Sequence, residues 1–185
     1  KLQRSKPLEG AAAAAVAYLK ADRPSCLITG GLGGLGLKAA LHLSELGARQ
    51  LVLSSRNGRV ARAGQGLTDQ LHKLCRSSAQ VAMRACDAAD AHEVTLLAQT
   101  TPECSIALHA AGSLHDVLLR SMTSDQLSLA FMPKAGGAAV LCSAFARVRL
   151  SALVLFSSVA ATFGNVGQAN YAAANAYLDS VATCR

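Results

Sequence analysis

The chain has 185 residues, of which 51% are hydrophobic and only 16% are charged. This length and composition suit one domain with a sizeable core and exclude a largely disordered chain. The net charge is +7, but aromatic residues make up only 4% and the basic residues are scattered, so we expect no nucleic-acid binding. No run of 18 or more apolar residues occurs, so we expect no membrane span.

Hydrophobic runs and helical periodicity alternate along most of the sequence. A linker over residues 1–10 and a short alanine-rich helix over 11–20 come first. Five strands then follow, at 26–29, 51–53, 81–85, 106–109 and 150–156. Helices are predicted at 34–47, 64–78, 88–99, 123–147 (interrupted at Pro133) and 169–182. Such alternation predicts an α/β fold with a doubly wound, parallel, Rossmann-type sheet covered on both faces.

A glycine-rich segment joins the first predicted strand to the first helix. It fits both G-x-G-x-x-G and T-G-x-x-x-G-x-G, and it consists of Thr29, Gly30, Gly31, Leu32, Gly33, Gly34, Leu35 and Gly36. Glycines allow a tight turn and let a pyrophosphate approach the backbone, while the helix that follows offers free N–H groups. The alternative is a glycine-rich turn without a ligand. The strand–turn–helix context favours a dinucleotide site.

The end of the second predicted strand distinguishes between the two nicotinamide dinucleotides. A unit that binds NAD carries an acidic residue here, about 20 residues after the glycines, for the ribose 2′-hydroxyl. This strand ends instead with Ser55 and Arg56. A guanidinium suits a 2′-phosphate, so the sequence favours NADPH. The alternative for Arg56 is a solvated loop arginine.

Further motifs follow the later strands. They are Cys86-Asp87, His109-Ala110-Ala111-Gly112, Pro133-Lys134, and the segment 156–179 with Ser158, Tyr171 and Asn175. With these motifs the chain, from about residue 25 to 184, resembles the short-chain dehydrogenase/reductase family. More narrowly, it resembles the ketoreductase domains of modular polyketide synthases and animal-type fatty acid synthases. Most short-chain reductases carry Y-x-x-x-K, whereas this chain has Asn175 at the lysine position and Lys134 on the preceding helix, as synthase ketoreductases do.

This resemblance implies a role for each motif residue. Tyr171 would donate the proton, Lys134 would favour the ionised phenol and bind the nicotinamide ribose, and Ser158 would donate a hydrogen bond to the carbonyl oxygen. Asn175 would support a proton relay. The resemblance places Asp87 beside the adenine, and the cofactor would also be bordered by Ala110, Ala111 and Gly112. No metal is implied.

Each of these residues also has an ordinary interpretation. Ser158 could be a polar residue at a strand end, and Tyr171 a half-buried helix tyrosine. Lys134 could be a surface lysine, and Asp87 the N-cap of the next helix. His109 is expected to pack beside the cofactor rather than act as an acid.

The resemblance also implies the domain organisation, reaction and partners. Residues 25–185 would be the NADPH-binding catalytic domain, with a C-terminally incomplete sheet and no lid, and weakly active or inactive alone. Residues 1–24 would be a linker or a remnant of an upstream structural subdomain. The reaction would be reduction of a 3-ketoacyl thioester on the phosphopantetheine of an acyl carrier protein, beside other domains of the same synthase. A non-catalytic cofactor-binding or structural module is the alternative.

Two further expectations concern cellular location and stereochemistry. The six cysteines include no C-x-x-C pair, so we expect no zinc site. Several of them lie in apolar strand-like runs, where cysteine behaves as a small hydrophobic residue, so a reducing compartment is expected: the cytoplasm, or an organelle such as a plastid. The segment Leu114-His115-Asp116 matches two of three positions of an L-D-D motif that marks one stereochemical class of polyketide ketoreductases. Asn170 fits the same class, and the chain has no tryptophan. A D-configured 3-hydroxy product is therefore expected.

Overall fold

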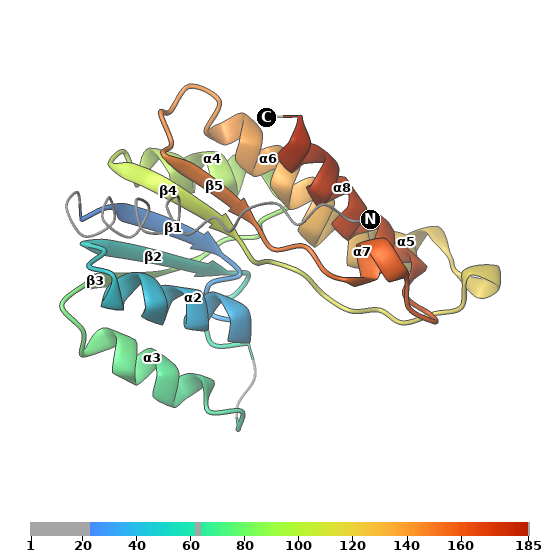
Figure 1. Cartoon of the computed structure of the whole chain (residues 1–185), viewed down its shortest axis with the longest axis horizontal. Coiled ribbons are helices and arrows are strands. Elements are labelled where there is room, and N and C mark those ends of the chain that lie inside the picture. Colours follow the sequence, from blue (N-terminus) through green and yellow to red (C-terminus); the bar gives the residue numbers. More distant parts are fainter. Residues whose placement is uncertain (1–22, 62–63, 185) are drawn as a thin grey trace, which may run out of the picture.

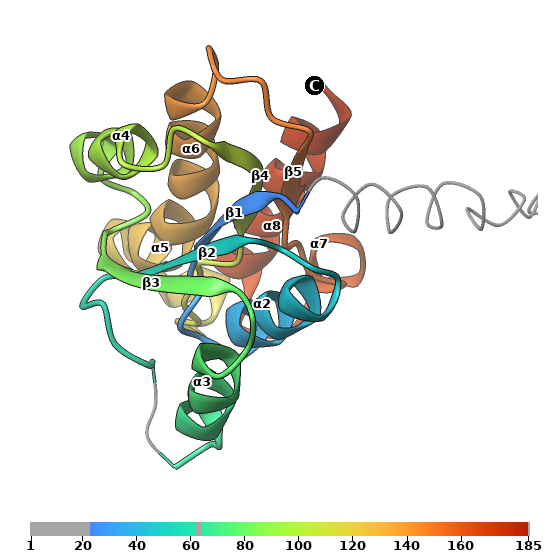
Figure 2. The ribbon, with the colours of Figure 1, turned by 90° about the vertical axis from the view of Figure 1, so that its left-hand side faces the viewer.

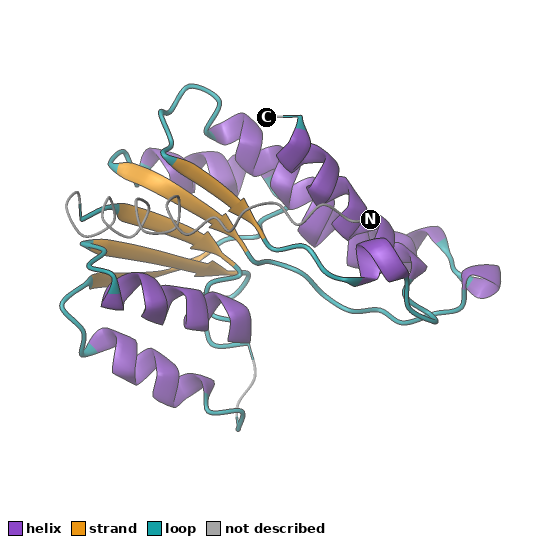
Figure 3. Cartoon of the chain, viewed as in Figure 1, coloured by secondary structure: helices purple, strands orange, loops and turns teal. Residues whose placement is uncertain are grey.

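The computed structural model describes residues 23–61 and 64–184. The predicted helix at 11–20 lies outside these residues, as does nearly all of the predicted upstream segment 1–24. Five parallel strands form one sheet in the order β3-β2-β1-β4-β5 (Figures 1 and 3). They are β1 (Ser25–Thr29), β2 (Gln50–Ser55), β3 (Gln80–Ala85), β4 (Cys104–His109) and β5 (Ala152–Leu155). The predicted doubly wound parallel sheet and all five of its strands are confirmed.

Helices cover both faces of the sheet. The main ones are α2 (Gly34–Glu45), α3 (Leu67–Cys75), α4 (Ala91–Gln99), α5 (Ser124–Phe131), α6 (Gly137–Ala144) and α8 (Ala169–Thr183). Shorter pieces are the 3₁₀ turn η1 (Leu119–Ser121), the π-helical turn η2 (Met132–Gly136) and α7 (Ala160–Phe163). In Figure 2, α4 and α6 lie on one side of the sheet, and α2 and α3 on the other.

Two buried hydrophobic clusters hold these layers together. One joins Ile28 and Leu53 of the sheet to Leu37 of α2 and Leu74 of α3. The other lies on the opposite face, where the sheet meets α4 and α6; its members include Leu27, Val52, Val94, Leu97, Leu141 and Phe145. Because both faces are covered, the strands read as continuous apolar runs, and this explains why they were predictable from the sequence.

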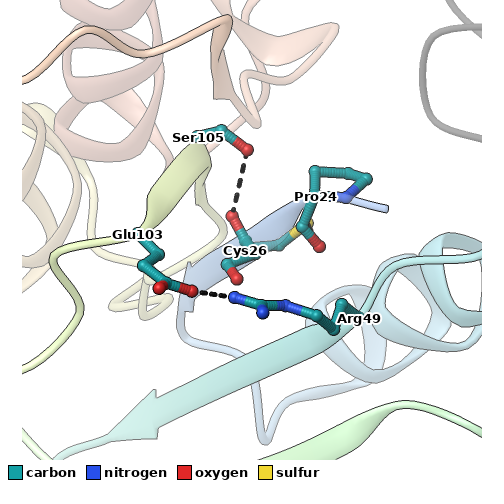
Figure 4. A network of polar contacts seen from close by, with 6 residues as sticks. Pro24, Cys26, Arg49, Glu103 and Ser105 are labelled. Carbon is teal, nitrogen blue, oxygen red and sulfur yellow. Dashed lines mark hydrogen bonds and ion pairs between the residues drawn. The ribbon is translucent and has the colours of Figure 1, made fainter. Parts of the chain in front are cut away.

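A polar network fixes the N-terminal edge of the central strands (Figure 4). Arg49, just before β2, forms an ion pair with Glu103, just before β4. Ser105 of β4 donates a hydrogen bond to the Ser25 carbonyl of β1, at an Oγ–O distance of 3.5 Å. These contacts lie at the edge opposite the strand ends that carry the predicted site residues, so they stabilise the sheet without entering that site.

Three predicted helices differ from the structure. The helix expected at 64–78 covers only Leu67–Cys75, because Gly66 has a left-handed φ of +69° and so precedes the first turn. The helix expected from residue 88 begins at Ala91, because Asp90 is its N-cap and accepts hydrogen bonds from the amides of His92 and Glu93. The long helix is not interrupted at Pro133.

Pro133 lies instead in a π-helical turn that keeps the helix continuous from Ser124 to Ala144. Proline has no N–H for the carbonyl four residues earlier, that of Leu129. The Ser113 hydroxyl donates to that carbonyl at 2.7 Å, so the carbonyl is not left unpaired. A side chain from a distant loop therefore replaces the hydrogen bond that proline removes.

The same helix bears on the membrane prediction. Among the residues that the structure describes, Ser124–Ala144 is the one helix long and apolar enough to cross a membrane by length and composition alone. Core helices of globular domains meet the same criterion, and this helix packs against α4 and α8. The absence of a membrane span stays a prediction.

Candidate active site

A groove runs along the carboxyl ends of the strands, where ligands bind in open parallel sheets. One part, with a volume of about 450 Å³, is lined by the glycine loop, by Lys134 and by Tyr171. A second part, of about 170 Å³, is lined by residues that follow β2 and β3. The two parts share Gly30, Gly33, Ala61, Ala110, Gly112 and Ser113. The groove therefore connects the glycine loop to both groups of predicted site residues.

The glycine loop packs too tightly for side chains at three of its positions, Gly30, Gly31 and Gly36. Gly30 has a φ of +70°, and a Cβ there would lie 2.5 Å from the Ala111 amide nitrogen. A Cβ on Gly36 would lie 2.4 Å from the Gly30 carbonyl oxygen. The loop thus closes on itself at the start of α2 and leaves its outer surface open to the groove, as a bound pyrophosphate requires.

The residues of this loop have different positions relative to the groove. Gly30, Gly33, Gly34, Leu35 and Gly36 line it. Thr29 and Leu32 are buried, and a Cβ on Gly31 would lie 2.6 Å from the Ile28 carbonyl oxygen. These three residues therefore shape the turn from beneath rather than facing a ligand.

The second part of the groove contains the residues predicted to select the cofactor. Ser55, Arg56 and Asp87 all line it. Ser55 Oγ lies 2.9 Å from the Arg59 carbonyl oxygen and holds the turn after β2. Asp87 is not the helix N-cap, which is Asp90, so that alternative is wrong; Asp87 Oδ1 accepts a hydrogen bond from the Ala89 amide at 3.0 Å.

Lys134 is the most deeply placed charged group of the site. Its side chain is only 5% exposed, so the alternative of a surface lysine is wrong. Nζ donates a hydrogen bond to the Phe156 carbonyl at 2.7 Å and lies 5.4 Å from the centre of the Tyr171 ring. Burial lowers the pKa of Lys134 to about 8, although the charge of Asp179 acts in the opposite direction.

Tyr171 and Asn175 lie one turn apart on α8, as predicted. The Tyr171 ring lines the groove. Asn175 is fully buried, and its Nδ2 donates to the Tyr171 carbonyl at 2.8 Å. Its Oδ1 has no hydrogen-bond partner among the described residues, which leaves that oxygen able to accept one. This arrangement is compatible with a supporting role for Asn175 beside the tyrosine.

The serine pair after β5 is arranged differently from expectation. Ser157, rather than Ser158, is among the residues that line the groove, and its hydroxyl donates to the Asn175 carbonyl at 3.3 Å. Ser158 is half-buried, and its Oγ accepts a hydrogen bond from the Ala160 amide at 3.2 Å. The role predicted for Ser158 stays a prediction.

Sequence reasoning assigned no role to Ser113, and for His109 it expected only packing beside the cofactor, which stays a prediction. His109 is fully buried at the end of β4, and Ser113 lines the groove and holds the Leu129 carbonyl. The motif that contains His109 was recognised, but its contacts depend on a helix more than 20 residues later in the chain. In the described part of the chain, no group of three or more His, Cys, Asp or Glu residues is arranged to hold a metal ion.

Comparison with known proteins agrees with this geometry. The family model described as KR domain matches residues 25–185. The spectinabilin polyketide synthase system protein NorB of Streptomyces orinoci is 44% identical over 86% of this chain. The pikromycin polyketide synthase component PikAII of Streptomyces venezuelae is 40% identical over 84%. The chain spans only 7% and 4% of these two relatives.

Solved structures give the same result. The first ketoreductase of the tylosin polyketide synthase matches with a TM-score of 0.78 and 36% identity, over 88% of this chain and 35% of that one. An A-type ketoreductase from a modular polyketide synthase matches with a TM-score of 0.77 and 38% identity, over 86% and 34%. KR domains are oxidoreductases of the short-chain dehydrogenase/reductase type and bind a nicotinamide cofactor. The chain therefore belongs to the KR-domain family, as a ketoreductase domain of the polyketide synthase kind.

Proposed function

We propose that this domain uses NADPH to reduce a 3-ketoacyl thioester, held on an acyl carrier protein, to the 3-hydroxyacyl thioester. The observation that carries the proposal is the pairing of Lys134 with Tyr171. The ammonium lies 5.4 Å from the centre of the phenol ring, in the same groove as the glycine loop. A phenol beside a buried cation, next to a dinucleotide loop, suits proton donation to a ketone during hydride transfer.

Each residue of the groove has a separate role in the proposed reaction. NADPH, when bound, supplies the hydride. Tyr171 donates its hydroxyl proton to the carbonyl oxygen of the substrate, and the Lys134 ammonium stabilises the phenolate that forms. A serine hydroxyl after β5 donates a hydrogen bond to the same oxygen as charge develops. We assign this role to Ser158, as the family motif does, with Ser157 as the second candidate because it lines the groove.

Two features of the groove support the choice of NADPH in this proposal. The glycine loop and Ala110–Gly112 form a backbone cradle for the pyrophosphate, in which a Cβ on Gly30 would collide with Ala111. Arg56 lines the second part of the groove, at the strand end where an NAD-binding unit carries an acid. A guanidinium there would pair with the 2′-phosphate, and Asp87 would lie beside the adenine.

The synthase context is part of the same proposal. The matched relatives are polyketide synthase proteins far longer than this chain. We propose that the substrate arrives on the phosphopantetheine of a carrier protein and that other synthase domains lie on the same polypeptide. We also propose a reducing compartment, because Cys26, Cys86 and Cys104 are buried in the core as thiols.

The proposal is tested by steady-state assay of the full-length polypeptide with NADPH and a 3-ketoacyl thioester. Tyr171→Phe should lower kcat by about 100-fold or more, since a proton donor contributes on that order. Tyr177→Phe is the matched control, because Tyr177 lies on the same helix and packs against Phe131, away from the groove. NADPH binding by both variants should stay close to wild type.

Two results would contradict the proposal. Near-normal turnover by Tyr171→Phe would remove the tyrosine from the reaction. NADPH binding without any thioester reduction by the wild type would favour the alternative of a non-catalytic cofactor-binding module.

A further inference from the structure

The helix that carries Lys134 is irregular at that residue. The turn Met132–Gly136 is π-helical, with the α-helices α5 and α6 on either side of it. A π turn widens the helix and disturbs its regular hydrogen bonds, and such turns occur often at functional sites. Its conformation sets the position of the Lys134 side chain, so whatever stabilises this turn also positions the ammonium.

His109 contacts the backbone of this turn from the end of β4. Its Nε2 lies 2.9 Å from the Lys134 carbonyl oxygen, and its Nδ1 lies 2.7 Å from Thr29 Oγ1. A carbonyl only accepts hydrogen bonds, so Nε2 carries the proton and donates it. Burial lowers the pKa of His109 to about 4, so the ring is neutral near pH 7. Its Nδ1 therefore accepts from the Thr29 hydroxyl, and this chain of two hydrogen bonds fixes the ring.

The packing around this histidine leaves little room for movement. A Cβ on Gly137 would lie 2.7 Å from His109 Cε1, so only glycine lets the helix come this close to the ring. A Cβ on Gly112 would lie 2.9 Å from Lys134 Cε, so the lysine stem passes directly over Gly112. Ser113 then holds the Leu129 carbonyl on the preceding turn. The short segment from His109, at the end of β4, to Ser113 thus contacts the helix before, at and after its irregular turn.

We propose that His109 is a positioning residue for Lys134: through the Lys134 carbonyl it holds the π turn that carries the ammonium to Tyr171. His109 lines neither part of the groove, so it does not act on substrate directly. Ser113 is a second positioning residue, which acts on the helical turn before the π turn through the Leu129 carbonyl. The expected effect on kcat rests on the proposed reductase function. The hydrogen bond between His109 and the Lys134 carbonyl does not, because it is present in the cofactor-free chain.

The kinetic test is a double-mutant cycle in the full-length polypeptide, assayed with NADPH and a 3-ketoacyl thioester. His109→Leu removes the donor while keeping an apolar side chain in the core, and Lys134→Met removes the ammonium. His109→Leu should lower kcat by about tenfold or more while the KM for NADPH changes by less than about threefold. If His109 acts through Lys134, the double variant should be no slower than Lys134→Met alone, within about twofold.

His109→Gln and Ser113→Ala extend the test in case His109→Leu folds poorly. Glutamine keeps an N–H donor and should recover most of the lost kcat. Ser113→Ala should lower kcat in the same direction by a smaller factor. Val94→Ala is the matched control, because Val94 is a fully buried core residue of α4 that does not line the groove. It should lower thermal stability without this loss of kcat.

Hydrogen exchange of the cofactor-free polypeptide gives a readout independent of catalysis. Amides of Met132 and of residues 134–138 should exchange about fivefold faster or more in His109→Leu than in Val94→Ala, because the π turn opens more easily. Unchanged exchange, or kinetic losses that multiply in the double variant, would overturn the role of His109. An inactive wild type, or full activity in Lys134→Met, would instead refute the proposed function and leave the exchange result to decide the inference.

Discussion

Replacing Arg56 with alanine tests how the groove selects its cofactor. Arg56 follows β2 and lines the part of the groove that also contains Asp87. In NADPH the 2′-phosphate is the one group that NADH lacks. If Arg56 contacts this phosphate, the substitution should weaken NADPH binding and leave NADH binding nearly unchanged.

The expected size of the effect follows from the exposure of Arg56. A hydrogen bond to a charged group contributes about 1.5–3 kcal/mol, which corresponds to about ten- to a hundredfold in affinity. Arg56 is exposed, so solvent and salt screen the interaction and the lower end of this range applies. We therefore expect Arg56→Ala to weaken NADPH binding by about tenfold and NADH binding by less than about twofold.

A nearby arginine provides a control of equal charge. Arg59 lies three residues later and lines neither part of the groove. Arg59→Ala removes the same charge from the same loop, so it should change NADPH affinity by less than about twofold at physiological salt. Titrations that follow cofactor fluorescence would give the dissociation constants of both variants for NADPH and for NADH. Equal losses for NADPH and NADH in Arg56→Ala would show that Arg56 does not recognise the phosphate.

Two further predictions concern the reaction itself. Because burial lowers the pKa of Lys134 to about 8 and the ammonium is the required form, kcat/KM should fall as pH rises through about 8. A profile that stays flat from about pH 7 to about pH 9.5 would contradict a need for that ammonium. The product should have the D configuration, since Leu114–Asp116 matches most of the L-D-D motif, and chiral chromatography showing mainly the L product would refute this.

The sheet was predictable because its strands are short apolar runs separated by helical periodicity. The helix ends were less predictable, because they depend on single residues. Gly66 adopts a left-handed conformation that delays α3, and Asp90 rather than an earlier residue caps α4. Several residues near each boundary could serve as a cap, and the backbone path that selects one of them is a tertiary property.

The continuous helix through Pro133 could not be predicted from local sequence. Proline normally interrupts a helix because it removes a hydrogen bond and crowds the preceding turn. Here the partner that compensates for it is Ser113, 20 residues earlier in the sequence and beyond the reach of any periodicity. The same limit applies to the serine pair: the motif assigns the hydrogen-bond role to Ser158, but only the backbone turn after β5 decides which of the two serines lines the groove.

Lys134 does not lie on the helix that carries Tyr171, and this explains why several buried hydrogen bonds are needed to hold the two side chains together. In a Y-x-x-x-K arrangement, helical geometry alone places the two side chains on one face. Here Lys134 and Tyr171 lie on different helices, so the distance between them depends on how η2 packs against α8. Helix packing alone leaves the two helices free to slide and rotate, and buried hydrogen bonds with fixed geometry remove that freedom.

Hydrogen bonds fix the lysine at both ends: Nζ donates to the Phe156 carbonyl, and His109 donates to the Lys134 carbonyl. On the other helix, the Asn175 amide bonds to the Tyr171 carbonyl one turn earlier. Because Asn175 takes the usual lysine position, the distance between Lys134 and Tyr171 is set by contacts between helices. A buried histidine outside the groove can therefore control catalysis.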